Sequence, residues 1–460
     1  MATTTVSIGS NQSIDTETPS GASGSNPYTV TFGTNPNSNV AVGDIMTMDD
    51  SANTGTTFIY LLTGISGSNY TVKYCSGGSG ADSPTNITDE YGDQQDAVFK
   101  RAFSTIILFE AMVDDSSPSY WGSSDDVVGE LHADSTFTDA TVTFDSKQSL
   151  SSVKLTVNSD DRHDGTAESG VLWKPTSGSG HDQGIIRVAI DSFTVEWLDI
   201  SMDSLDSRDT NKAIVLTGTN DDCIIRNNLI HDKGGNPGGN GPFIIHTIGA
   251  GASTDTVTIQ NNIIYEIVET SNDSVSAINT NQWSGISNIY NNTVYKLTCA
   301  GSSKVSVGIM FGNVSSAVVN VKNNIVSLLT VVGASTLARA YRKVGASSTA
   351  NTANNLSDDT THATYNAANM GNSLGDSTAL VGKTLSEIDF VSTVVGSEDL
   401  HIDTSSVCLE AGVDLGTTNG VNIDIDGVDR DATGVTWDIG ADQKSVATST
   451  GSPAFFLFMD

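Results

Sequence analysis

Short runs of β-branched and other apolar residues, alternating with polar ones, recur along most of the chain. Such runs predict β-strands, because successive side chains of a strand point to opposite faces of its sheet. Residues 224–230 and 257–265 are typical, since each has two such runs with an Asn-Asn pair between them. Aromatic residues are few and turn-forming residues are plentiful. The pattern therefore predicts an all-β protein.

The Asn-Asn pairs mark an internal repeat. Successive pairs are 34, 30, 32 and 31 residues apart, at Asn227-Asn228, Asn261-Asn262, Asn291-Asn292, Asn323-Asn324 and Asn354-Asn355. Asparagine tolerates the left-handed backbone conformation that a sharp corner requires. A unit of about thirty residues cannot bury its own apolar face, so the units must stack strand on strand. We expect the asparagines at equivalent corners to form a side-chain ladder.

This repeat predicts a right-handed parallel β-helix, a solenoid formed by a single chain, over residues 124–443. Two other repeat architectures fit less well. Leucine-rich repeats require a dense leucine pattern, which is missing here. Propellers require periods of about forty residues or more with Trp-Asp-like marks.

The residues before the repeat divide into four predicted segments. Residues 1–25 are rich in Ser, Thr and Gly and are expected to form an arm. Residues 26–75 carry four alternating runs, which are typical of a small antiparallel β domain, here assigned to attachment. Residues 76–95 are predicted to be a linker. In residues 96–123 the best helical pattern of the chain runs from Asp96, a candidate N-cap, to Val113, and we expect this helix to cap the open end of the solenoid.

Residues 444–460 form a C-terminal tail with an apolar run at 454–459. This run is too short to cross a bilayer. Left exposed it would favour aggregation, so we expect it to cover the last coil or to dock on another subunit. No stretch reaches the length of a membrane span, and residues 1–6 lack the basic start and apolar run of a secretory signal.

Composition narrows the possible partners. The formal net charge is −33, and the 21 Lys and Arg residues are not clustered. Binding to a nucleic acid backbone requires several cations close together, so nucleic acid is not an expected partner. Four widely spaced cysteines show no zinc-type spacing and are interpreted as small buried hydrophobic residues, at Cys75, Cys223, Cys299 and Cys408.

Two groups of residues could carry chemistry. Asp424, Asp426, Arg430 and Asp438 could form an acid/base or calcium cluster, but such a group more often makes a buried ion-pair network that seals a turn. A sugar-cleaving β-helix needs two carboxylates roughly 5–9.5 Å apart. The candidates on equivalent loops are Asp203, Asp206, Asp209, Asp232, Glu266, Glu269 and Asp273.

The more economical interpretation of these carboxylates is a solvated acidic surface. A pectate-lyase mechanism is disfavoured because arginine is almost absent between Arg226 and Arg339. His231 and His246 have no Ser or Cys partner at a recognisable spacing, and the Gly-rich residues 234–241 are interpreted as a loop. We therefore predict no catalytic residue, no metal site and no cofactor site.

The repeated Asn-Asn corners resemble those of pectate-lyase-like right-handed β-helix proteins. Further motifs resemble the last coils of bacterial and phage β-helix proteins, where D-x-D-G-x-x-R is followed by D-I-G-A. In this chain the matching stretches are Asp399-Leu400-His401-Ile402, Glu410-Ala411-Gly412, Asp424-Ile425-Asp426-Gly427-Val428-Asp429-Arg430 and Asp438-Ile439-Gly440-Ala441-Asp442. Other stretches are similar to the opening coils of β-helix proteins of tailed phages, namely residues 101–106, 162–167, 173–178 and 195–200. The resemblance covers residues 96–443.

The resemblance implies a fold more strongly than a function, because one fold serves many functions. We expect a non-enzymatic structural protein of a tailed-phage virion that decorates or stabilises the head or tail surface. Its partners would be other virion proteins, bound through the N-terminal region, and further copies of itself, such as a trimer. Two alternatives stay open: a tailspike-like protein that binds or cuts a surface polysaccharide, with Trp283 as a candidate exposed aromatic, and a bacterial surface adhesin.

Overall fold

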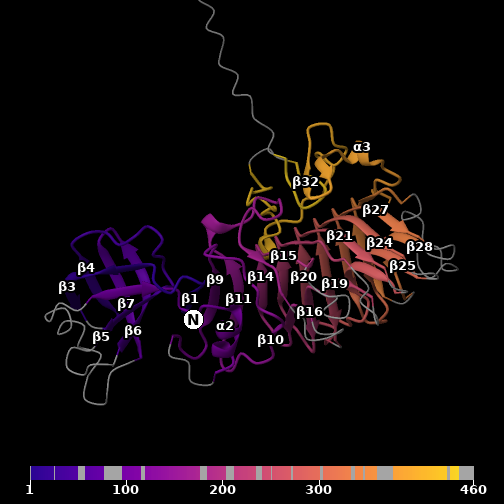
Figure 1. The fold of residues 1–460 in the computed structure, drawn as a ribbon. Helices are drawn as coiled ribbons and strands as arrows, with labels where there is room; N and C mark the ends of the chain where they lie inside the picture. The colour runs from indigo at the N-terminus through magenta and orange to yellow at the C-terminus, as the bar shows by residue number, and fades with distance from the viewer. Residues whose placement is uncertain are drawn as a thin grey trace, which may run out of the picture.

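The computed structural model describes residues 2–24, 26–49, 57–76, 96–115, 120–176, 184–203, 212–234, 241–249, 251–270, 273–300, 304–332, 337–345, 348–359, 377–432 and 436–444. These residues form a right-handed parallel β-helix and a separate antiparallel β-sheet (Figure 1), which confirms the predicted fold class. No helix in these residues is long and apolar enough to cross a membrane.

Three parallel sheets make up the solenoid, and each coil passes from sheet 1 through a corner to sheet 3 and then to sheet 2. Sheet 1 contains β1 (Thr3–Ile8), β9 (Asp126–Leu131), β11 (Ser152–Val157), β14 (Phe193–Glu196), β17 (Cys223–Arg226), β20 (Thr256–Gln260), β23 (Ile286–Tyr290), β26 (Val318–Lys322) and β29 (Thr349–Ala353). Sheet 2 contains β10 (Val142–Phe144), β13 (Ile186–Val188), β16 (Ile214–Thr217), β19 (Phe243–Ile248), β22 (Val275–Thr280), β25 (Val305–Phe311) and β28 (Leu337–Lys343). Sheet 3 contains β12 (Leu172–Trp173), β15 (Asp199–Ser201), β18 (Leu229–His231), β21 (Ile263–Glu269), β24 (Thr293–Cys299), β27 (Ile325–Val331) and β30 (Leu356–Ser357).

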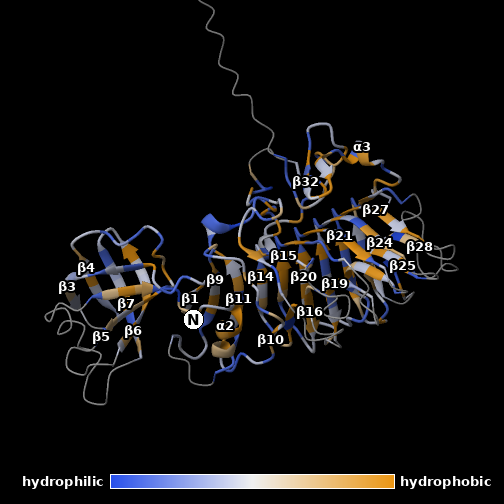
Figure 2. Cartoon of the chain, viewed as in Figure 1, coloured by the Kyte–Doolittle hydropathy of each residue, from blue (hydrophilic) through white to orange (hydrophobic). Residues whose placement is uncertain are grey.

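The interior of the solenoid is filled by columns of aliphatic side chains. In sheet 1, for example, Ile225, Ile259 and Ile289 occupy one register position in successive strands and are buried. Full burial of such a side chain stabilises the fold by about 1.5–3 kcal/mol. Apolar residues follow the stacked strands and polar residues fill most connections (Figure 2). The period-two alternation of the sequence is thus the alternation between core and outer face.

The asparagine pairs lie in one column, at the corner between sheets 1 and 3. The first asparagine of every pair has a φ of 52–56° and turns the chain. The second asparagines are buried and form a ladder, in which each side-chain amide nitrogen donates to the side-chain oxygen of the next asparagine at 2.9–3.0 Å. This ladder runs through Asn228, Asn262, Asn292, Asn324 and Asn355. The structure confirms the predicted corners and their ladder.

Among the described residues β30 is the last strand of the three stacked sheets, and the described residues from 377 onward do not continue the coils to residue 443 as predicted. Residues 377–432 and 436–444 instead fold back along the outer face of sheet 3, and we call them the C-terminal cover (Figure 1). The cover contains α3 (Leu385–Ile388), the hairpin β31 (Phe390–Val394) and β32 (Ser397–Ile402), and a short 3₁₀ turn, Thr418–Gly420.

Sheet 3 needs this cover because its outer face is apolar. Leu229, Ile263, Ile325 and Leu356 point outward from one register column and pack with apolar residues of the cover in a second buried cluster. A stripe of that kind would be unfavourable in water, since burying apolar surface yields about 25 cal/mol per Å². The motifs that resemble last coils therefore close the side of the solenoid rather than extend it.

Residues 2–24, which make up the described part of the predicted arm at 1–25, form strands instead. Strand β1 is the edge strand of sheet 1 and pairs in parallel with β9, because Val6 and Ile8 point into the solenoid core. Strands β2 (Asp15–Glu17) and β3 (Pro19–Gly24) join the N-terminal sheet, which also contains β8 (Ala97–Lys100), β5 (Ile45–Asp49), β6 (Thr57–Ser66), β7 (Asn69–Ser76) and β4 (Tyr28–Phe32). This sheet confirms the predicted antiparallel domain, which is larger than expected.

The capping helix is shorter than predicted. Residues 97–100 form β8, because Ala97 and Phe99 alternate into the core of the N-terminal sheet. Helix α2 (Ile106–Val113) begins after Thr105, whose side chain accepts a hydrogen bond from the Leu108 amide as an N-cap. Its buried residues Ile106, Phe109 and Val113 belong to the solenoid core. Of the predicted linker and the C-terminal tail, only Ser76 and Lys444 lie within the described residues.

A buried arginine joins the N-terminal sheet to the solenoid. Arg101 follows β8, and its side chain is 4% exposed. It donates to Asp44, which precedes β5, at 3.0 Å, and through two nitrogens to Asp134, which follows β9, at 2.9 and 3.0 Å. A two-pronged contact of this kind fixes orientation as well as distance. The two parts are thus joined by β1, by these two ion pairs and by Ile45 and Leu61 of β5 and β6, which pack in the solenoid core.

Replacing one rung of the ladder should destabilise the solenoid. In Asn292→Ala the carbonyls of Ile259 and Tyr290 and the side chain of Asn324 lose a donor in a buried position. We expect a loss of about 3 kcal/mol and a lower midpoint of urea unfolding, followed by circular dichroism. The control is Asn351→Ala on the exposed outer face of β29, which should change stability by less than about 0.5 kcal/mol. Equal effects of the two substitutions would contradict the structural role of the ladder.

Candidate functional site

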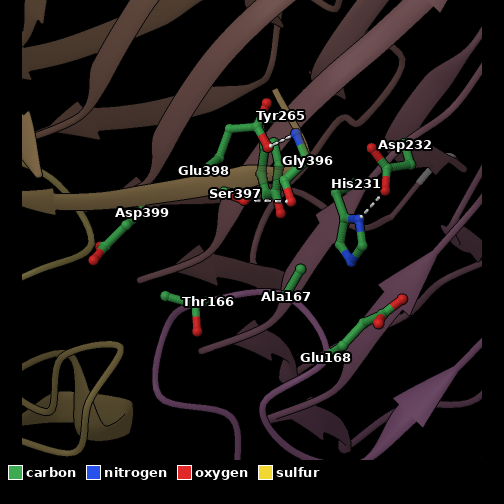
Figure 3. Close-up of a pocket in the computed structure, with 10 residues that line it drawn as sticks. All are labelled: Thr166, Ala167, Glu168, His231, Asp232, Tyr265, Gly396, Ser397, Glu398 and Asp399. Atoms are coloured by element: carbon green, nitrogen blue, oxygen red, sulfur yellow. Dashed lines mark hydrogen bonds and ion pairs between the residues drawn. The ribbon is translucent and has the colours of Figure 1, made fainter. Parts of the chain in front are cut away.

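A cavity of about 480 Å³ lies between sheet 3, the cover and the loop after β11, and we call it the cover cleft. Residues 166–168 of that loop line one side, and residues 396–399 of the β31–β32 hairpin line another (Figure 3). His231 and Asp232 at the end of β18, with Tyr265 of β21, complete the lining. The cleft brings together residues from three distant parts of the chain.

His231 is held between two aspartates. Its Nε2 atom contacts Asp199 at 2.7 Å and its Nδ1 atom contacts Asp232 at 2.8 Å, and the side chain is 1% exposed. Burial alone would lower the pKa of His231, but the hydrogen bonds to Asp199 and Asp232 outweigh it and raise this pKa to about 9. His231 is therefore an imidazolium at neutral pH with both nitrogens occupied, which suits a structural role better than proton transfer.

Tyr265 stacks on this imidazolium. The two rings lie 5.2 Å apart with an angle of 12° between their planes. Burial raises the pKa of Tyr265 well above its usual value, with the Asp199 carboxylate adding to the effect. The ring is only 3% exposed, so it cannot serve as an open stacking surface for a ligand.

Two glutamates meet at the edge of the cleft. Glu266 of β21 forms an ion pair with Lys296 of β24, and its carboxyl group also meets that of Glu398 from β32. Burial raises the pKa of Glu266, and the contact with Glu398 raises it further. Glu398 accepts a hydrogen bond from the Gly396 amide at 2.8 Å. The two carboxyl groups thus link the hairpin to sheet 3.

Most of the carboxylates that could form a sugar-cleaving pair have other partners. Asp203 pairs with Lys174 at 2.8 Å, Asp273 pairs with Lys304 at 3.6 Å, and Asp232 and Glu266 have the contacts described above. Glu269 is fully buried. Asp206 and Asp209 lie outside the described residues. Of the candidates within the described residues, Asp232 lines the cover cleft and Glu266 contacts Glu398, which lines it.

Arg430 seals a turn, as predicted, but not through ion pairs. The fully buried guanidinium donates to backbone carbonyls of residues 440 and 441 at 2.8 and 2.7 Å, and burial lowers its pKa. Within the described residues it contacts no carboxylate at ion-pair distance. Asp424 accepts from the amides of residues 426, 428 and 443, and Asp438 accepts from those of 410 and 444. Burial raises the pKa of Asp424 to about 7 and that of Asp438 to about 6.

Other predicted residues have structural positions. His246 is buried in β19 with its ring edge-on to Phe243 at 5.0 Å. Trp283 is 1% exposed, so the expectation of an exposed aromatic there is wrong. The four cysteines are free, and all but Cys75 are buried, as predicted. Residues 235–240 of the Gly-rich loop lie outside the described part of the chain.

No sequence motif predicts a role for His163, in the loop after β11, or for His401, in the cover. His163 is buried, contacts the Asn227 carbonyl through Nε2 at 3.0 Å and accepts from the Gly165 amide through Nδ1. His401 lies in β32 between Asp399 and Asp426. The alternation in Asp399-Leu400-His401-Ile402 is the one signal that could have indicated that Asp399 and His401 share a face.

Comparison with known proteins does not assign the chain to a family. No protein-family model matches the chain, and no curated protein matches it either.

The imidazolium of His231 should make stability depend on pH. Its pKa is about 9 in the folded protein and about 6.5 unfolded, so its contribution is complete below about pH 6.5 and is lost as the pH rises through 9. We compare His231→Gln with the native protein by urea unfolding. The native protein should be more stable by about 3 kcal/mol at pH 6, and the difference should shrink by pH 10. A difference that stays constant or grows with pH would contradict the assignment.

Proposed function

We propose that this chain is a non-enzymatic structural protein displayed on the surface of a tailed-phage particle. The observation that carries the proposal is the two-part architecture, in which the N-terminal sheet is joined to one end of the solenoid. The N-terminal sheet has a buried cluster of its own, and the solenoid has another, which also takes in Ile45 and Leu61 from β5 and β6. β1 and Arg101 join them. A compact module at one end and a long stacked body suit a protein that attaches at one end and covers or projects from a surface.

Two features make the solenoid rigid. The asparagine ladder fixes the spacing of successive coils, and the cover closes the apolar outer face of sheet 3. Parallel stacking on this pattern is resistant to local opening, because every backbone group inside a sheet pairs with both neighbours. A protein exposed on a particle surface needs a stable, rigid fold more than it needs conformational change.

The internal use of charged groups also supports a structural role. The carboxylates most suited to chemistry lie in contacts that hold the cover and the coils together: Asp232 with His231, and Glu266 with Lys296. The resemblance of the opening and closing motifs to β-helix proteins of tailed phages points to the particle as the location. The N-terminal sheet is the part that we assign to binding a major capsid or tail protein.

The test of this proposal is the location of the chain. Antibodies raised against the full chain, applied with gold label to purified particles whose genome encodes it, should decorate intact particles on the head or tail. The matched control is the same antibody preparation after absorption with the purified chain, which should leave the particles bare. Detection only in the cell fraction, or only inside disrupted particles, would overturn the proposal.

A second candidate function is the binding of a surface glycan, and the cover cleft favours it. The cleft is large enough for one or two sugar rings, and carboxylates of residues 168, 232, 398 and 399 surround it as hydrogen-bond acceptors. Incubation of the purified chain with host surface polysaccharide separates the two functions. New reducing ends or unsaturated sugars would overturn the non-enzymatic assignment, whereas binding without cleavage would add glycan recognition to it.

A further inference from the structure

Next to the cover cleft, one histidine and two aspartates converge on a point. His401 lies in β32, Asp426 lies in the turn that precedes Arg430, and Asp442 lies near the end of the cover. One possible ligand atom from each side chain lies within 4.8 Å of the other two. Among the described residues, this is the one group of three or more His, Cys, Asp or Glu side chains with such spacing.

The imidazole of His401 is oriented as in a metal-binding histidine. Its Nδ1 atom contacts the Asp399 carboxylate, and its Nε2 atom points to Asp426 at 2.9 Å. Histidines that bind metals commonly donate one ring N–H to a carboxylate, which fixes the tautomer and leaves the other nitrogen for the ion. Asp399 is in place for that positioning role, and a cation would replace the proton between Nε2 and Asp426.

Asp442 provides an observation independent of this histidine. The residue is 4% exposed, and one carboxylate oxygen accepts a hydrogen bond from the Ile402 amide at 2.9 Å. The other oxygen has no hydrogen-bond partner in the described part of the chain. A buried carboxylate with an unused oxygen is costly unless a cation or a proton compensates it. Burial raises the pKa of Asp442, and the charges of His401 and Arg430 only partly oppose this rise. Arg430 donates its hydrogen bonds to backbone carbonyls and to the Gln443 side chain and none to the unused carboxylate oxygen.

The site is held in shape by the solenoid. Gly165, in the loop after β11, has a φ of +84°, and a Cβ atom there would lie 2.4 Å from the His401 ring. The absence of a side chain lets the ring pack directly on this loop. Because the ligands come from three places in the cover and the His401 ring abuts a solenoid loop, an ion bound here would hold three segments of the cover together against that loop.

We propose that His401, Asp426 and Asp442 bind one divalent cation of borderline softness, with Zn²⁺ or Mn²⁺ as the ions of best fit. One imidazole nitrogen and two carboxylate oxygens are typical ligands of these ions, whereas Ca²⁺ prefers six to eight oxygen ligands. Three protein ligands leave positions for water. The ion stabilises the attachment of the cover, independently of whether the chain belongs to a virus particle.

The test uses the full chain after treatment with EDTA and dialysis. Isothermal titration with Zn²⁺ and with Mn²⁺ should show one site per chain for at least one of them, and that ion should raise the thermal unfolding midpoint. Asp426 is partly exposed, so Asp426→Asn should fold normally by circular dichroism and weaken binding at least about tenfold. His401→Gln should abolish the site, and Asp399→Asn should weaken binding by about 10–100-fold.

A matched control separates this site from other histidines. His231 also lies between two aspartates, but among the described residues no additional carboxylate converges with either of them as Asp442 does with Asp426 beside His401, so His231→Gln should keep the affinity for the ion. The proposal is overturned if neither ion binds at about 0.1 mM, a weak affinity for a three-ligand protein site. It is also overturned if binding survives unchanged in both His401→Gln and Asp426→Asn, or if only Ca²⁺ binds.

Discussion

The structure depends on satisfying the peptide groups at one tight corner that recurs in every repeated coil. The chain turns there inside a stack from which water is excluded, so each buried amide and carbonyl must find a partner. Asn262 shows how this is achieved: its side-chain nitrogen donates to the carbonyls of Ile225 and Gln260 and to the next rung, while its oxygen accepts from the coil before. An aspartate could not donate, and a serine is too short to reach three partners. Asparagine therefore suits this buried position at the five corners that carry the pair, whereas the equivalent corner one coil earlier is formed by Trp197 and Leu198.

The first asparagine of each pair connects this corner to the rest of the molecule. Its left-handed backbone turns the side chain outward, where the amide donates to carbonyls of the cover: Asn261 to residues 421 and 423, and Asn323 to residue 413. Stacked coils present these amides at regular intervals, and an extended segment running across them can accept from each in turn. The cover is thus bound by the same periodicity that stacks the coils, as well as by the apolar face of sheet 3.

Features that recur or alternate locally could be predicted from the sequence, and features that depend on distant partners could not. The asparagine ladder could be predicted because the Asn-Asn pair repeats at a nearly fixed period. The sequence of β8 also fits the start of a helix, because Ala97, Val98 and Phe99 match both the strand and the helix period over so short a run. The cover has no repeat, and its contacts join residues far apart in sequence, such as Glu266 and Glu398. No local pattern indicates such a pair, and the same holds for the convergence of Asp426 and Asp442 on His401.

The few cationic side chains of this acidic chain are used for internal contacts. The chain carries a formal charge of −33, yet several of its positive groups are buried between carboxylates: Arg101 between Asp44 and Asp134, and His231 between Asp199 and Asp232. Each of these ties segments that are distant in sequence, at the N-terminal junction and beside the cover. Salt weakens the mutual repulsion of the exposed acidic groups more than it weakens these buried pairs, because screening acts through the solvent. An acidic surface and cationic internal contacts are therefore compatible, and rising ionic strength favours the assembled fold by removing repulsion that the buried pairs must otherwise oppose.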